Sequence, residues 1–147
     1  MPANSQTFAY NLQRFVDAQT PVYDRVCEEL AAGRKQSHWI WYIFPQMRGL
    51  GRSETARYYG LASREEAQAF LEHPILRARL RQCVDLMMFV PARTLSEILA
   101  PPDDLKFISS MTLFGEVAAE PEPFVAALDK YAAGKRDDAT LALLAKQ

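Results

Sequence analysis

The residues best able to do chemistry in this chain are concentrated in residues 37–60. This stretch holds both tryptophans, three of the six tyrosines and one of the two histidines. Indole N–H and phenol O–H groups need hydrogen-bond partners when they are buried, so this cluster is more polar than a core requires. The segment is either an aromatic part of the core or the wall of a binding site, and we expect one face to serve each purpose.

Residues 37–44 (SHWIWYIF) predict a short buried helix, because they are apolar almost all round and Ser37 is a good N-cap. A proline directly after Phe44 is a good stop. Three residues share one face at helical spacing: Trp39, Tyr42 and Ile43. Trp41 lies on another face, and we expect a ligand to stack on Trp39 or Trp41.

The loop after that helix is a candidate anion site. Arg48 and Arg52 flank two glycines, and Ser53 follows at the start of the next predicted helix. Guanidinium groups, backbone that can approach closely and the free N–H groups of a helix start all favour phosphate or carboxylate. His38 and Gln46, from the two ends of the aromatic segment, belong to the same candidate site. An ordinary surface loop explains these residues equally well.

A second polar cluster lies in residues 103–115 (DDLKFISSMTLFG). Three hydroxyl side chains fall inside a predicted helix, where they are neutral to unfavourable. Lys106 and Ser110 are therefore candidates for a polar site wall, with packing at a crowded helix crossing as the alternative. The candidates for catalysis are His38 and Asp104, as a general acid or base, and only the fold could bring them together.

The charge distribution favours an anionic partner only locally. The net charge is −1, whereas residues 34–81 carry nine Lys or Arg against four Glu. This balance favours a small anionic ligand rather than nucleic acid or a membrane, and mixed solvated faces are the alternative. No apolar run approaches the ~18 residues of a membrane span, and the N-terminus has no signal-peptide pattern. We expect a soluble, cytoplasmic protein.

Cysteine and histidine usage predicts no metal and no cofactor. Cys27 and Cys83 occupy apolar positions of helical patterns, where cysteine behaves as a small, inert hydrophobe. A disulfide or a reactive thiol is the alternative. The chain has two histidines and none of the common phosphate-loop, zinc or nucleophile-elbow motifs. A histidine-rich metal site is therefore excluded.

The elements that must position these residues are helices. Apolar residues recur at helical spacing throughout the chain, and no run alternates with period two. About nine short-to-medium helices are expected, among them 8–19, 21–32, 53–59, 63–72, 74–89, 103–114 and 123–133. Ser63 with Glu66, and Thr94 with Glu97, predict capping boxes. Together these patterns predict one compact all-α domain over residues 1–147, with residues 1–6 disordered.

Five motifs along the chain resemble one uncharacterised bacterial family, domain-of-unknown-function family 1810. They are HWIWYIFPQ (38–46), GLGRSETARYYGL (49–61), EAQAFLEHPILRARL (66–80), PDDLKFISSMTLF (102–114) and LDKYAAGKRDDATLALL (128–144). The resemblance implies a small, mostly α-helical fold and no established activity. Members are often labelled calpastatin, but calpastatin is a disordered inhibitor and this composition is that of a folded domain.

A more distant similarity is to the NADAR family of ADP-ribose-linked N-glycosidases. SHWIWYIFPQ (37–46) and then FLEHPILRARL (70–80) follow the order of two NADAR motifs. Those enzymes use an acidic residue in the first motif to assist cleavage of a ribosyl C–N bond, whereas here His38 follows Ser37 with no glutamate. Three function classes stay open: a pocket for a nucleotide or ribose-phosphate-like anion, an N-glycosidase built on that pocket, and a non-enzymatic interaction module.

Overall fold

Every regular element of the structure is a helix. The computed structural model describes residues 9–147, which contain ten helices, no strand and one isolated bridge between Met47 and Leu61. The helices are α2 (Gln13–Gln19), α3 (Tyr23–Ala31), α4 (Ile40–Ile43), α5 (Glu54–Tyr59), α6 (Arg64–Glu72), α7 (Pro74–Phe89), α8 (Leu95–Ile98), α9 (Asp103–Val117), α10 (Glu122–Ala132) and α11 (Asp138–Ala145). The predicted all-α fold is confirmed. The disorder predicted for residues 1–6 lies outside the described residues.

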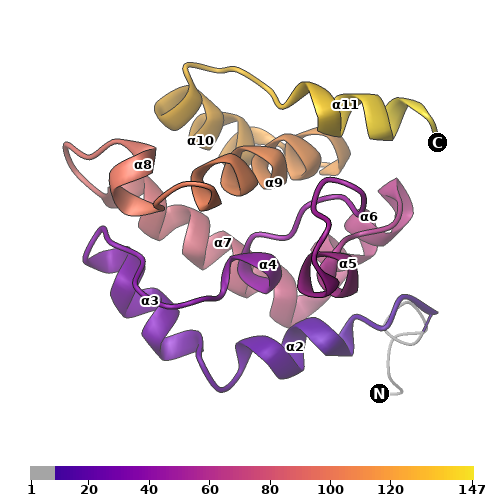
Figure 1. Cartoon of the computed structure of the whole chain (residues 1–147), viewed down its shortest axis with the longest axis horizontal. Coiled ribbons are helices and arrows are strands. Elements are labelled where there is room, and N and C mark those ends of the chain that lie inside the picture. The colour runs from indigo at the N-terminus through magenta and orange to yellow at the C-terminus, as the bar shows by residue number, and fades with distance from the viewer. Residues whose placement is uncertain (1–8) are drawn as a thin grey trace.

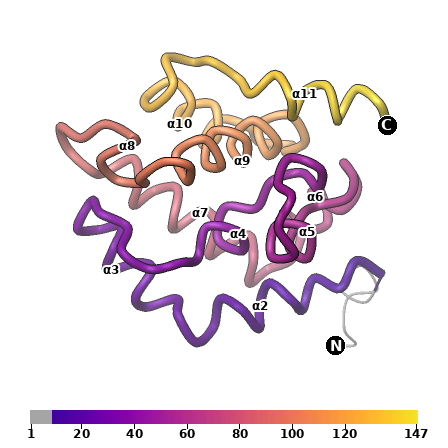
Figure 2. The backbone as a smooth tube through the Cα atoms, viewed as in Figure 1, coloured from indigo at the N-terminus to yellow at the C-terminus, as the bar shows by residue number. Residues whose placement is uncertain are grey.

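Helices α7 and α9 organise the packing (Figure 1). The longest helix, α7, crosses the middle of the molecule and contacts α2, α3, α4, α6 and α10. Helix α9 contacts α4, α6, α8, α10 and α11. The chain path in Figure 2 places α2 and α3 on one side and α9 to α11 on the opposite side. The short α4, which carries the aromatic segment, touches both α7 and α9.

Phenylalanine rings connect these helices in the core. Phe15 of α2 meets Phe70 of α6 edge to face, with ring centroids 5.0 Å apart. Phe70 in turn lies 5.4 Å from Phe114 of α9. Phe44, directly after α4, meets Phe107 of α9 edge to face at 4.9 Å. All five rings are buried, and such pairs contribute about 0.5–1.5 kcal/mol beyond the area they bury. The aromatic segment is thereby fixed to α9.

The two predicted capping boxes have different outcomes. Thr94 and Glu97 form the reciprocal pair of hydrogen bonds, so that prediction is confirmed. Ser63 forms only half of a box: its hydroxyl accepts from the N–H of Glu66 at 3.0 Å. The Glu66 carboxylate instead accepts from the Arg14 guanidinium of α2 and from the N–H of Ala62. The buried guanidinium of Arg14, from another helix, therefore takes the carboxylate that a capping box would direct to the N–H of Ser63.

The second helix begins later than predicted. Its predicted start is residue 21, but α3 begins at Tyr23, because Thr20 ends α2 and donates its hydroxyl to the carbonyl of Val16 at 2.8 Å. Helix α9 begins at Asp103 as predicted, and both Asp103 and Asp104 lie inside its first turn, after Pro102. Acidic side chains there still favour the positive end of the helix. The same helix continues to Val117, three residues beyond the predicted end.

Candidate functional site

A buried carboxylate fixes the entry to the aromatic segment. Glu29 of α3 accepts hydrogen bonds from the N–H groups of Gln36 (2.8 Å) and Ser37 (3.0 Å), the Ser37 hydroxyl (2.6 Å) and the Trp39 indole (2.9 Å). Burial alone would raise the pKa of this carboxyl, but the four hydrogen bonds outweigh it and hold the pKa at about 2. The predicted N-cap role of Ser37 is therefore wrong, and α4 begins three residues later.

The two tryptophans divide between the core and the surface. Trp39 is 1% exposed and lies in the core with Ile43, and the Lys35 ammonium lies 5.1 Å from its ring. Trp41 is partly exposed, and the Lys106 ammonium lies 5.1 Å from its ring. Both distances suit a cation–π contact. Since the ring of Trp39 is covered, Trp41 is the tryptophan that a ligand can reach.

A small hollow lies beside Trp41. Its lining residues come from α4, α5, α9 and the connections around them: Ile40, Trp41, Phe44, Gln46, Ala56, Tyr59, Gly60 and Lys106. The volume is about 10 Å³, which is room for about one water molecule. Trp41, Gln46 and Lys106 were all predicted as ligand-binding residues, and the fold brings Lys106 of α9 to the aromatic segment that carries the other two.

The charge beside this hollow is positive. Asp103 receives two ammonium groups, Lys35 at 2.8 Å and Lys106 at 3.5 Å. Two cations therefore share one carboxylate. One turn along α9 from Lys106, the hydroxyl of Ser110 is buried and has no hydrogen-bond partner among residues 9–147. Buried hydroxyls are as a rule paired. The Ser110 hydroxyl is therefore able to form a hydrogen bond with a further group, on the same helix that carries the Lys106 ammonium.

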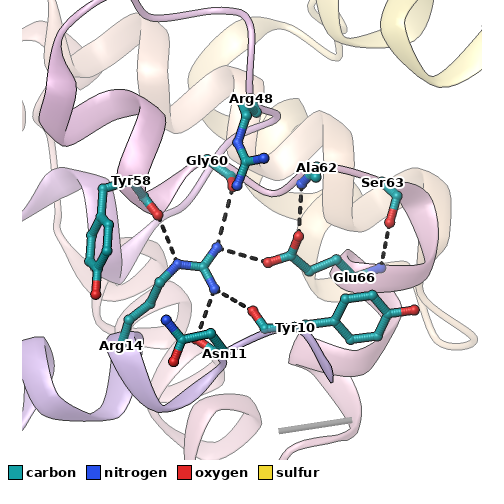
Figure 3. A network of polar contacts seen from close by, with 9 residues as sticks. All are labelled: Tyr10, Asn11, Arg14, Arg48, Tyr58, Gly60, Ala62, Ser63 and Glu66. Carbon is teal, nitrogen blue, oxygen red and sulfur yellow. Dashed lines mark hydrogen bonds and ion pairs between the residues drawn. The ribbon is translucent and has the colours of Figure 1, made fainter. Parts of the chain in front are cut away.

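Two arginines hydrogen-bond to the carbonyl of Gly60, a residue that lines the hollow (Figure 3). The guanidinium of Arg14 donates to the carbonyls of Tyr58 (2.8 Å) and Gly60 (3.3 Å) and pairs with Glu66 at 2.8 Å. Both members of that pair are 4% exposed. Arg48 donates to the same Gly60 carbonyl at 3.3 Å. A buried ion pair with further hydrogen bonds fixes local geometry, so this network sets where Gly60 lies.

The remaining predicted site residues are not among those lining the hollow. His38 is exposed. The Asp104 carboxylate accepts from the Ser96 hydroxyl at 3.1 Å. Arg52 and Ser53 are exposed, and the hydroxyl of Ser53 caps α5. Because that hydroxyl already satisfies a first-turn N–H of α5, the predicted cradle of loop and helix start is not assembled around the hollow.

Sequence reasoning missed Glu29, Lys35 and Asp103 as organising residues. Glu29 follows Glu28 on α3, and only the fold distinguishes the buried carboxylate from its exposed neighbour. Lys35 and Asp103 are far apart in sequence and meet only because α9 packs beside the aromatic segment. Polar contacts of this range have no local period, so no spacing rule could have identified them.

A larger hollow of about 790 Å³ lies between α6, α7 and residues 117–124. Its floor is apolar, with Leu71, Leu80 and Phe124. Its charged lining is two arginines and two glutamates, Arg77, Arg81, Glu72 and Glu120. This balanced charge does not select an anion, and no predicted site residue lines it. Within residues 9–147, no helix has both the length and the apolar character needed to cross a bilayer.

Comparison with known proteins gives a family and a solved fold. The family model described as "Protein of unknown function (DUF1810)" matches residues 9–144. The crystal structure of the conserved hypothetical protein Rv1873 from Mycobacterium tuberculosis is 53% identical, with a TM-score of 0.92, over 93% of this chain and 98% of that one. No curated protein matches. The more distant similarity to the NADAR family is not confirmed.

Proposed function

Because the chain belongs to the DUF1810 family, which brings no activity with it, we propose a function from the hollow itself: it binds the anionic group of a small ligand, of nucleotide or ribose-phosphate type, between Trp41 and Lys106. The observation that carries this proposal is the position of the Lys106 ammonium, 5.1 Å from a partly exposed indole ring. A partly exposed aromatic ring with a cation held over it suits a phosphate bound by the cation and a base or sugar ring nearby.

The charges and the amide around the hollow support an anion rather than a cation. Lys35 and Lys106 share the single carboxylate of Asp103. The Arg48 guanidinium does not line the hollow, but it donates to the carbonyl of Gly60, which does. Gln46 lines the hollow and supplies an amide that can donate to an oxygen. The volume of about 10 Å³ admits a single oxygen of the anionic group, so the rest of the ligand lies outside, over the partly exposed Trp41.

Two observations favour binding without hydrolysis. Neither catalytic candidate, His38 nor Asp104, lines the hollow. The carboxylate of Asp104 is also occupied by the Ser96 hydroxyl and by the N–H of Leu105. A general acid or base has to reach the proton that it transfers. We therefore propose a binding protein rather than an N-glycosidase.

The test is a titration with ADP-ribose, AMP, ribose 5-phosphate and inorganic phosphate, followed by thermal shift and by tryptophan fluorescence. Trp41 is the exposed one of the two tryptophans, so quenching that disappears in Trp41→Phe places the ligand on that ring. Saturation at about 100 times the Kd adds about 2.7 kcal/mol to stability.

Lys106→Met is the decisive variant, and Lys135→Met is its control. Asp103 keeps Lys35 at 2.8 Å when Lys106 is lost, so the fold is retained. Lys135 is exposed and lies on the connection between α10 and α11, so its loss changes the net charge equally. We expect at least tenfold weaker binding for Lys106→Met alone, about 1.4 kcal/mol. If no probe binds, or if both variants bind equally, the hollow is no anion site and an interaction module is the function left.

A further inference from the structure

A pair of cysteines lies where α3 packs against α7. Tyr23 and Cys27 are one turn apart on α3, and Arg79 and Cys83 are one turn apart on α7. The Arg79 guanidinium lies 5.1 Å from the Tyr23 ring, and the Tyr23 hydroxyl donates to the Arg79 carbonyl at 3.4 Å. One turn further along both helices, Cys27 of α3 and Cys83 of α7 occupy matching positions on the two neighbouring helices.

The two helices run in the same direction along this contact. Beyond the C-terminal end of α3, Gly33 adopts a φ of +73°, and a Cβ placed there would lie 3.0 Å from Val90, directly after α7. Tyr23 with Arg79, Cys27 with Cys83 and Gly33 with Val90 therefore lie in register. This register places the two cysteines at the same level of two packed helices, without any flexible loop between them.

The two thiols differ in access. Cys83 is fully buried, in agreement with the inert thiol predicted from its apolar position, whereas Cys27 is only partly buried. Interaction with the neighbouring Cys83 thiol lowers the pKa of Cys27 to about 6, against the opposing effect of burial. The pKa of Cys83 is raised, because its proton is shared with Cys27 and because it is buried. One sulfur is therefore the nucleophile and the other is its shielded neighbour.

We infer that Cys27 and Cys83 form a peroxide-reactive thiol pair that closes to an intramolecular disulfide between α3 and α7. In the first step the Cys27 thiolate attacks one oxygen of hydrogen peroxide. The O–O bond breaks, hydroxide leaves, and Cys27 becomes a sulfenic acid. In the second step the Cys83 sulfur attacks the Cys27 sulfur, hydroxide leaves and takes the Cys83 proton, and water forms. Two thiols and one peroxide give one disulfide and two waters.

This site is separate from the hollow beside Trp41. Neither cysteine lines that hollow, so the failure of one proposal leaves the other standing. Closure would connect α3 to the central helix α7. Reduction by a dithiol would restore both thiols, because thiol–disulfide exchange is reversible.

The test uses the full chain, fully reduced and folded, with hydrogen peroxide at one equivalent and protein dilute enough to disfavour intermolecular bonds. Intact mass spectrometry should show the loss of two hydrogen atoms, and a non-reducing peptide map should join the peptides that contain Cys27 and Cys83. In Cys83→Ala the expected product is a sulfenic acid on Cys27, trapped by a 1,3-diketone as an adduct. In Cys27→Ala the remaining thiol should stay unmodified until the protein is unfolded.

Three results would overturn the inference: a folded wild type that keeps both thiols, a wild type that accumulates oxidised Cys27 without the cross-link, or a disulfide that joins two chains. Circular dichroism of each variant establishes that it is folded. If Cys83→Ala does not fold, the peptide map of the wild type decides alone, since it contains both sulfurs in their native packing.

Discussion

Replacing Glu29 by glutamine removes a charge that four donors surround, and the size of the effect follows from the pKa. Lowering the pKa of Glu29 from its ordinary 4.5 to about 2 corresponds to about 3 kcal/mol of folding stability, at ~1.4 kcal/mol per pKa unit. With its oxygen in the place of Oε1, glutamine can still accept from the N–H groups of Gln36 and Ser37 and from the Trp39 indole. Its NH₂ group, in the place of Oε2, cannot accept from the Ser37 hydroxyl, and the negative charge is gone. We therefore expect Glu29→Gln to lose about 3 kcal/mol at pH 7, out of the ~5–15 kcal/mol of a typical domain.

The pH dependence of this loss is the sharper test. The folded-state pKa lies below the unfolded-state value, so the stabilisation is complete above about pH 5. It is lost as the pH falls from 4.5 towards about 2. The difference in stability between wild type and Glu29→Gln should therefore be constant from pH 6 to 8 and shrink at lower pH. Other carboxylates titrate in both proteins alike and cancel in the difference.

The assay is urea unfolding, followed by circular dichroism at several pH values, with Glu28→Gln as the control. Glu28 precedes Glu29 and is exposed, so the same change there should stay within about 0.5 kcal/mol. Fluorescence adds a local readout, because Glu29 accepts from the Trp39 indole. A Glu29→Gln variant as stable as Glu28→Gln, or a difference that does not shrink below pH 4.5, would refute the assignment of these four hydrogen bonds.

Three further predictions test the packing by the same unfolding assay. Trp39→Ala should cost about 3–5 kcal/mol because Trp39 is buried, whereas Trp41→Ala should cost less than half of that; equal losses would contradict the division of faces. Arg14→Met leaves the buried Glu66 without its partner and should cost about 3–5 kcal/mol. The double variant Arg14→Met with Glu66→Met should cost less, because no unpaired charge is left buried. A smaller loss in the single variant than in the double one would argue against a buried ion pair. Gly60→Ala should destabilise by more than about 1 kcal/mol, since its Cβ would lie 2.7 Å from backbone, and a neutral result would show that this wall can move.

The helices were predictable because their signals are local. The capping box at Thr94 and the proline that opens α7 each act within one turn, and both are where the sequence placed them. The apolar period likewise separated Trp39 from Trp41. The errors occurred where a distant charge took over a local role: Glu29 captured the hydroxyl of Ser37, and Arg14 captured the carboxylate predicted for a capping box.

The candidate site was predictable in composition but not in assembly. The sequence identified Trp41, Gln46 and Lys106 by type, because indole, amide and ammonium groups in an apolar setting are unusual. It could not show that Arg52 lies outside the lining of the hollow, since loop conformation depends on packing against other segments. Nor could it show that Cys27 and Cys83 lie at the same level of neighbouring helices, because that depends on the register between α3 and α7.

The bridge between Met47 and Leu61 gives the segment between them a common anchor point. The N–H of Arg48 donates to the Leu61 carbonyl at 2.8 Å, and the N–H of Leu61 donates to the backbone carbonyl of Gln46 at 3.0 Å. Between these two paired ends, most side chains from residue 52 to 58 are exposed. A lightly packed segment of this kind opens at a lower free energy than the whole domain.

One wall of the hollow, including Tyr59, belongs to this segment, whereas Trp41 and Lys106 do not. As it stands, the hollow has room for about one water molecule and nothing larger, unless this wall moves. For a larger group that enters the hollow, the apparent Kd equals the intrinsic Kd divided by the open fraction. Substitutions at the base of the segment would then tune affinity without touching a ligand.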